Sequence, residues 1–187
     1  MVSSSNRLTI EEFLELPEGD LPYELINGQA IPKMSPKYFH SAVQAALIIL
    51  LQAKCKCQEK GRIYPEWGVK LQRNKLDWIP VPDLTYISDQ RLGVDWILDE
   101  ACPVAPELVI EIISPGQTFG DMTEKATDYL QSGVNRVWLV DTKSQSITVF
   151  YPDALPKTFR GTSVITDELL PELAITPQAI FQQAGLA

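Results

Sequence analysis

The stretch Leu108-Val109-Ile110-Glu111-Ile112-Ile113 is apolar on both of its alternating faces, except for one carboxylate in its middle. This pattern is typical of a buried strand at the centre of a sheet that helices cover on both sides. An ionised glutamate in such a strand is costly unless a cation or a hydrogen-bond donor meets it. Glu111 is therefore a candidate functional residue, with a buried ion pair or a strand end that reaches solvent as the alternatives.

The residues after this strand predict a helix and then a second strand. Asp121-Met122-Thr123-Glu124 has the D-x-x-E form of a capping box and would open a helix that ends at Gly133. Residues 137–141 are apolar and predict a short strand. Because strand, helix, strand units favour a parallel crossover, we expect the strands at 108–113 and 137–141 to pair in parallel.

The rest of the chain completes an α/β pattern. Residues 35–59 have apolar side chains at three- and four-residue spacing and predict the longest helix. Asn27-Gly28 predicts a tight type I′ hairpin turn, so Glu24 should lie on a hairpin strand. Further strands are expected at 67–71, 81–87 and 147–151, short helices after Thr9 and near the C-terminus, and an irregular segment at 90–106. We expect a central mixed β-sheet flanked by helices, antiparallel at its hairpin end.

Composition limits the class of protein. A chain of 187 residues with 45% hydrophobic content fits one domain, residues 1–187, with its own core. Cys55, Cys57 and Cys102 are odd in number, and the first two have the wrong spacing for a zinc knuckle, which favours a reducing cytoplasm. Because the longest apolar run, residues 45–51, is too short to span a bilayer, we expect a cytoplasmic protein with no membrane partner.

The formal net charge of −8 counts against a nucleic-acid binder, which usually neutralises phosphates with a basic surface. The charge is not decisive, since a site for a divalent cation must gather carboxylates and basic residues can still cluster locally. For any single basic residue, ordinary surface solubility is a better explanation than phosphate contact. The candidates for phosphate contact are Lys33, Lys37, Arg62, Lys70, Arg73 and Lys75.

Two further charged residues accompany the strand carboxylate. Asp83 follows a proline at the start of a predicted strand, where an aspartate is often only a turn residue. Asp121, Lys125 and Tyr129 lie at i, i+4 and i+8 on the next helix and so share one face. A solvated, salt-bridged stripe is the alternative interpretation of that face.

Taken together, the proline–aspartate pair, the strand glutamate 28 residues later (111 − 83) and the helix lysine resemble the PD-(D/E)XK nuclease superfamily. The chain more specifically resembles the Uma-two family of endonucleases. The segments that carry this resemblance are residues 23–28, 81–84, 106–115, 121–129 and 133–141. The superfamily pattern expects a lysine two residues after Glu111, where this chain has Ile113, and the resemblance implies that Lys125 replaces it from the helix.

The resemblance implies hydrolysis of DNA phosphodiester bonds by water activated on Mg²⁺ or Mn²⁺. Asp83, Glu111 and the main-chain carbonyl of Ile112 would bind the ion, because hard cations prefer oxygen ligands. Lys125 would orient the nucleophile or offset charge on the phosphoryl oxygens. A homodimer would suit this superfamily, since cutting two strands calls for two sites.

Other residues match family positions with less weight. Glu24 could bind metal directly or through water, or be an exposed strand residue beside a turn. His40 could contact phosphate or assist proton transfer, or be a satisfied structural histidine. Tyr129 shares the helix face of Lys125 and could hold that side chain in place. Gln44 is the weakest candidate, since only its position on the helix near His40 supports it.

Two other functions remain open from the sequence. The acidic composition and the displaced lysine are also compatible with a binding or regulatory module that keeps the nuclease fold without cutting. A metal-dependent hydrolase of another substrate would be favoured if the pocket were too narrow for a polynucleotide and lacked a rim of the basic residues named above.

Overall fold

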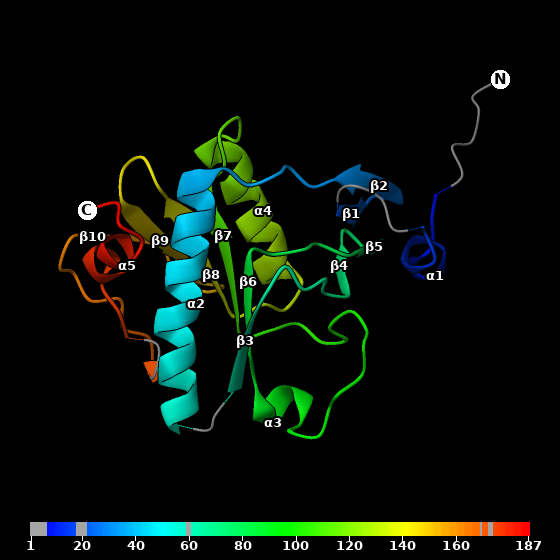
Figure 1. The fold of residues 1–187 in the computed structure, drawn as a ribbon. Helices are drawn as coiled ribbons and strands as arrows, with labels where there is room; N and C mark the ends of the chain where they lie inside the picture. The colour runs from blue at the N-terminus through cyan, green and yellow to red at the C-terminus, as the bar shows by residue number, and fades with distance from the viewer. Residues whose placement is uncertain (1–6, 18–21, 59–60, 169, 172–173) are drawn as a thin grey trace.

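A computed structural model describes residues 7–17, 22–58, 61–168, 170–171 and 174–187. Its core is a six-stranded sheet with the strand order β10-β9-β8-β7-β6-β3, as Figure 1 shows. These strands are β3 (Gly61–Pro65), β6 (Leu84–Ser88), β7 (Leu108–Ile112), β8 (Arg136–Asp141), β9 (Ser146–Phe150) and β10 (Lys157–Arg160). The expected α/β fold with a central sheet is confirmed.

The centre of the sheet is β7, whose five residues are all buried. It pairs in parallel with β8, with Glu111 opposite Leu139 and Ile112 opposite Val140. The other four pairings in this sheet are antiparallel, so the sheet is mixed. The parallel crossover expected from the strand, helix, strand order is confirmed.

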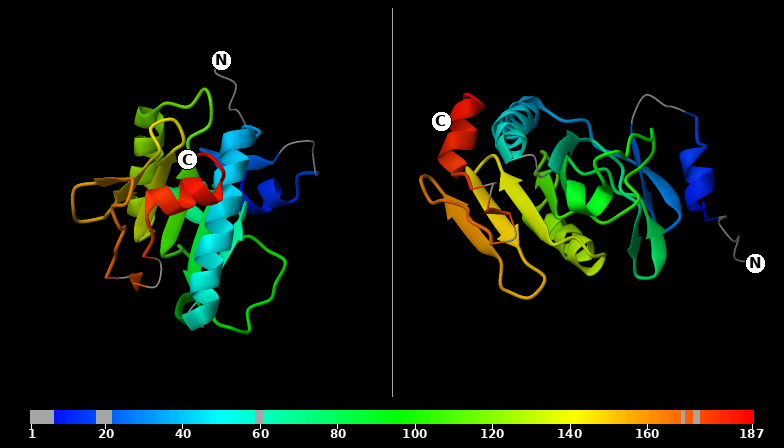
Figure 2. Two further views of the ribbon diagram at one scale, coloured as in Figure 1. Left: turned by 60° about the vertical axis from the view of Figure 1, so that its left-hand side comes forward. Right: turned by 90° about the horizontal axis from the view of Figure 1, so that it is seen from below.

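Helices cover both faces of the sheet (Figure 2). On one face, α2 (Tyr38–Gln58) and α5 (Pro177–Gln183) pack against a core that includes Ile110 and Ile112 of β7. On the other face, α4 (Phe119–Gln131) packs against a second core that includes Val109. Because side chains alternate along a strand, Glu111 faces α4 and not α2.

The hairpin of β1 (Tyr23–Ile26) and β2 (Gln29–Pro32) turns at Asn27 and Gly28, whose φ angles of 53° and 78° fit the predicted type I′ turn. The hairpin does not extend the central sheet, however. It forms a separate two-stranded sheet and reaches the rest of the fold through a bridge between Leu25 and Ile79. The expectation that the hairpin is the antiparallel end of the main sheet was therefore wrong.

The start of α4 also differs from the prediction. Thr118 is the N-cap, and its hydroxyl accepts the Asp121 N–H at 3.1 Å while the Asp121 carboxylate accepts from Thr118. Asp121 is thus the third helical residue in a capping box, and the box predicted for residues 121–124 was wrong. The threonine is the better cap here because the helix starts at Phe119.

The strand predicted at residues 67–71 was also wrong. Only β4 (Leu71–Arg73) begins there, in a small sheet with β5 (Leu76–Trp78), while Val69 makes an isolated bridge to Cys102. The edge strands β3 and β10 were missed, and α3 (Asp89–Leu92) overlaps the start of the expected irregular segment. Short edge strands have weak hydrophobic alternation, so tertiary pairing decides them.

The N-terminal helix α1 (Ile10–Leu14) has the predicted capping box of Thr9 and Glu12. Within the described residues, no helix has both the length and the apolar character needed to cross a membrane. Cys102 is a buried free thiol, whereas the side chains of Cys55 and Cys57 lie outside the described part of the structure.

Candidate active site

A pocket of about 470 Å³ opens where β7 ends, between the hairpin, α2 and α4. It collects side chains from segments that are far apart in the sequence. The residues selected from the sequence that line it are Glu24, His40, Asp83, Glu111, Ile112 and Lys125. Lys33, Gln44, Glu66, Ser114 and Gln117 also line it. The fold therefore brings all six proposed catalytic and metal-binding positions to one place.

Glu111 lies on the α4 side of β7 and is 3% exposed. Its Oε1 accepts the Tyr129 hydroxyl at 2.7 Å and lies 3.0 Å from the Lys125 ammonium. Burial raises the pKa of Glu111 to about 7; Lys125 opposes this shift, while the charges of Asp83 and Glu24 add to it. Burial is thus the main cost of ionising this carboxylate, and Lys125 is the nearest cation that offsets it.

Lys125 reaches back from α4 over the strand end, as its displaced position in the sequence requires. Its Nζ lies 3.0 Å from both Glu24 Oε1 and Glu111 Oε1. Burial lowers the pKa of Lys125, but the two carboxylates outweigh burial and raise the pKa above its usual value. Lys125 is accordingly a fixed positive charge that bridges the hairpin and the central strand.

Glu24 is buried on β1 and is not the exposed strand residue of the alternative interpretation. Its Oε1 also accepts the Val81 N–H at 3.0 Å, just before the loop that carries Asp83. The carboxylate therefore ties the hairpin to the loop that carries Asp83 and to Lys125 at once.

Asp83 lies just before β6, and its Oδ2 accepts the Ile112 N–H at 2.7 Å. His40 Nε2 lies 2.9 Å from the same oxygen, and Lys33 Nζ lies 2.9 Å from Oδ1. Burial would raise the pKa of Asp83, but the His40 hydrogen bond and the Lys33 charge hold it at about 2. The carbonyl of Ile112 points to the same side of the strand as its N–H, toward Asp83.

Three residues enlarge the site beyond the sequence prediction. Lys33, selected only as a phosphate contact, forms ion pairs with Asp83 and with Glu66. Gln44 donates to Glu66 Oε1 at 2.8 Å and to the Asp83 carbonyl at 2.9 Å. Glu66, which follows β3 with a φ of 50°, was not predicted, because nothing in its local sequence pattern distinguishes it from a surface charge.

Most of the other basic candidates lie elsewhere. Arg62 pairs with Asp89 at 3.4 Å, Lys70 with Glu100 at 3.9 Å, and Arg73 with Asp128 at 2.7 Å. These three and Lys75 do not line the pocket, and Lys37 lines a neighbouring pocket. Of the six basic candidates, the pocket includes Lys33 alone.

The mixed sheet with helices on both faces, and the pocket at the end of its central strand, define a restriction-endonuclease-like protein. The family model Uma2, described as "Putative restriction endonuclease", matches residues 10–178, and the chain belongs to this family. A solved structure from Anabaena variabilis, described as "a putative nuclease belonging to DUF820", is 26% identical, with a TM-score of 0.82 over 95% of this chain and 99% of that one. No curated protein matches the chain.

Proposed function

We propose that this protein is an endonuclease that hydrolyses phosphodiester bonds in DNA with the help of Mg²⁺ or Mn²⁺. The observation that carries the proposal is the meeting of Asp83, Glu111 and Lys125 in one pocket of a nuclease-family fold. The Asp83 loop, β7 and α4 supply these groups, and the Asp83–Ile112 hydrogen bond of 2.7 Å holds the first two elements together.

The donor chemistry of the pocket fits a hard divalent cation. Four carboxylates line it, from Glu24, Glu66, Asp83 and Glu111, against two ammonium groups and one imidazole. Asp83, Glu111 and the Ile112 carbonyl would hold the ion, with water and substrate phosphate as further ligands. In the described part of the chain, no three His, Cys, Asp or Glu side chains form a metal cluster on their own.

A bound ion would supply a water of lowered pKa and would polarise the phosphate. The chain's own residues orient and balance these groups. His40 and Lys33 keep Asp83 ionised, the Ile112 N–H fixes the orientation of its carboxylate, and Tyr129 fixes the Glu111 carboxylate. Lys125 places a permanent positive charge beside Glu111, where it can offset charge that develops on the phosphoryl oxygens.

The test is cleavage of supercoiled plasmid and of single-stranded DNA with Mg²⁺, Mn²⁺ or EDTA. Asp83→Asn, Glu111→Gln and Lys125→Met remove the charges with little change in shape, and each should abolish or greatly reduce metal-dependent cutting. Glu107→Gln is the matched control, because Glu107 is a buried carboxylate just before β7 that does not line the pocket. An active Asp83→Asn or Glu111→Gln protein would contradict the proposal.

A second function is supported by one contact. The Lys33 ammonium lies 2.9 Å from Asp83 Oδ1, so a cation from the chain already neutralises a proposed metal ligand. This arrangement would suit a nucleic-acid-binding or regulatory module that does not cut. Wild-type protein that binds DNA with the same affinity in Mg²⁺ and EDTA, and cuts nothing, would favour this function.

A further inference from the structure

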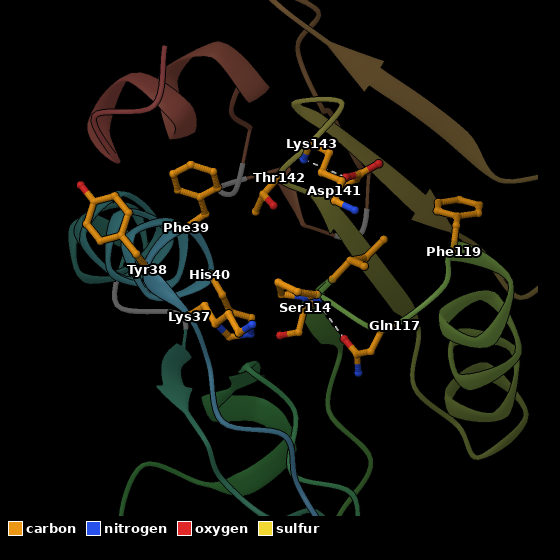
Figure 3. A pocket seen from close by; sticks show the side chains of 12 residues that line it. Lys37, Tyr38, Phe39, His40, Ser114, Gln117, Phe119, Asp141, Thr142 and Lys143 are labelled. Atoms are coloured by element: carbon orange, nitrogen blue, oxygen red, sulfur yellow. Dashed lines mark hydrogen bonds between the residues drawn. The ribbon is translucent and has the colours of Figure 1, made fainter.

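A second pocket, of about 500 Å³, lies beside the candidate active site. The two pockets share three lining residues, namely His40, Ser114 and Gln117. Figure 3 shows Phe39 on one side of this second pocket and Phe119 on the other, with Thr142 of the β8–β9 turn above His40. Its volume lies in the range of roughly 300–1,000 Å³ that is usual for sites of small organic ligands.

Exposed aromatic rings border this pocket. Phe39 is 56% exposed and Phe119 is 48% exposed, although burial of such rings normally stabilises a fold. Tyr38, 72% exposed, lies against Phe39 with 5.7 Å between the ring centroids. The two phenylalanines come from the first turns of α2 and α4, so rigid elements position them. Flat apolar rings at a pocket mouth suit a flat aromatic ligand.

The charged groups of the same pocket suit a ligand with a phosphate. Lys37 and Lys143 contribute two positive charges, against the single carboxylate of Asp141. That carboxylate is already engaged, since it accepts from the Lys143 N–H at 2.9 Å and from the Ser144 hydroxyl at 2.8 Å. The lysines are therefore the charged groups most available to a ligand that enters here.

His40 connects the two pockets. Its Nε2 is bound to Asp83, whereas its Nδ1 is buried and has no hydrogen-bond partner. The side chain is only 5% exposed, so this unsatisfied nitrogen carries a desolvation cost in the free protein. A polar group of a ligand that spans both pockets could satisfy it.

We propose that this second pocket binds an unpaired nucleotide of the substrate, adjacent to the phosphate that is cut in the active-site pocket. The inference rests on the proposed nuclease function. A base within a duplex is stacked on both faces and cannot enter a pocket between Phe39 and Phe119 without leaving the helix. The favoured substrate is consequently single-stranded DNA or DNA with unpaired nucleotides. Base stacking on the rings gives affinity without sequence readout.

The experiment measures binding of fluorescently labelled oligonucleotides to protein in EDTA, where no cutting occurs. Single-stranded, gapped and blunt duplex DNA are compared, and a single abasic site is moved along the strand. Phe39→Leu and Phe119→Leu remove a ring but keep an apolar side chain. Tyr151→Leu is the matched control, because Tyr151 follows β9 at the opposite end of the sheet, beside Arg136 and Lys157.

We expect single-stranded DNA to bind more tightly than blunt duplex. The phenylalanine variants should weaken this binding by roughly fivefold to a hundredfold, as for loss of one stacked base, while Tyr151→Leu should not. One abasic position should weaken binding to the wild type but add no further loss in Phe39→Leu. Equal binding by the wild type and both phenylalanine variants, in a protein that cuts the same oligonucleotide, would overturn the pocket's role and leave the nuclease function intact. A protein that neither binds nor cuts would overturn both.

Discussion

The two ends of β7 each have a buried glutamate, and the two residues are held in opposite ways. Glu107, just before the strand, accepts from the Ser88 N–H at 3.0 Å and from the Ser88 hydroxyl at 2.6 Å, and lies 3.2 Å from Arg91 Nε. Glu111, near the other end, shares Lys125 with Glu24 and faces the charge of Asp83. Glu107 thus has its own cation and two hydrogen-bond donors, whereas Glu111 shares its cation with Glu24.

This difference separates a structural buried charge from a candidate functional one. A buried ion pair with matching donors holds a strand start in place and leaves no capacity for a ligand. Burial, with the charges of Asp83 and Glu24 adding to it, raises the pKa of Glu111 to about 7, so the ionised carboxylate carries a cost that a divalent cation would remove. The comparison therefore predicts that substitutions at the two ends affect different properties.

The largest expected effect is on catalysis at the Glu111 end. Glu111→Gln and Asp83→Asn should each lower the rate of metal-dependent cleavage by about a thousandfold or more, because each loses several kcal/mol of charge stabilisation. Glu107→Gln should keep near-wild-type cleavage. Single-turnover cleavage of a labelled oligonucleotide at saturating Mg²⁺ measures the three rates, and a similar loss in Glu107→Gln would erase the proposed difference between the two ends.

The cations that pair with the two glutamates provide the next contrast. Lys125→Met should reduce the cleavage rate about a hundredfold to a thousandfold, as for removal of one group that stabilises transition-state charge. Arg91→Met should leave the rate unchanged and lower the free energy of unfolding by about 1–2 kcal/mol, since Arg91 also donates to Ala105 and Asn135. Cleavage rates and urea unfolding of both variants test this prediction. An Arg91→Met protein that is inactive but as stable as the wild type would contradict it.

In EDTA, replacing the glutamate at each end of β7 by glutamine should change the free energy of unfolding in opposite directions. The folded protein keeps the Glu111 proton up to about pH 7, whereas the unfolded chain releases it near its ordinary value of 4.5. Between these values the folded state binds more protons, so this group's contribution to stability falls as pH rises. At pH 8, Glu111→Gln should raise the free energy of unfolding by about 1–3 kcal/mol, and Glu107→Gln should lower it by a similar amount.

Urea unfolding at pH 5 and pH 8 measures this effect. The increase in the free energy of unfolding caused by Glu111→Gln should be smaller at pH 5, where the wild-type carboxyl is already protonated. A gain that stays equal at both pH values would show that Glu111 is not destabilised by its charge.

The smallest effect should follow from loss of one hydroxyl at each end. Tyr129→Phe removes the 2.7 Å donor to Glu111, and Ser88→Ala removes the 2.6 Å donor to Glu107. Each should lower the free energy of unfolding by about 1 kcal/mol. The cleavage rate should fall, by about tenfold or less, only in Tyr129→Phe, where the donor positions a proposed metal ligand. Equal rates for both variants would limit Tyr129 to a structural role.

The sequence alone was sufficient for elements whose local pattern is strong. The apolar run of β7, the capping box of α1, the Asn27-Gly28 turn and the helical spacing of α2 each have one dominant physical signal. Local signals were insufficient at β3, β10 and the start of α4, where edge pairing or a competing cap decides the structure. The residues of the candidate site could be selected from the sequence because their types and their order along the chain resemble those of a nuclease family.

Only the tertiary structure decided how those residues meet. Lys33 and Glu66 have no local pattern that distinguishes them from surface charges, and they join the site because the hairpin and the end of β3 converge on Asp83. Likewise, Lys125 serves both Glu24 and Glu111 because α4 crosses the end of β7. A sequence specifies side-chain chemistry and short-range geometry, but the balance of charge in a buried pocket depends on distances between segments that only the folded chain sets.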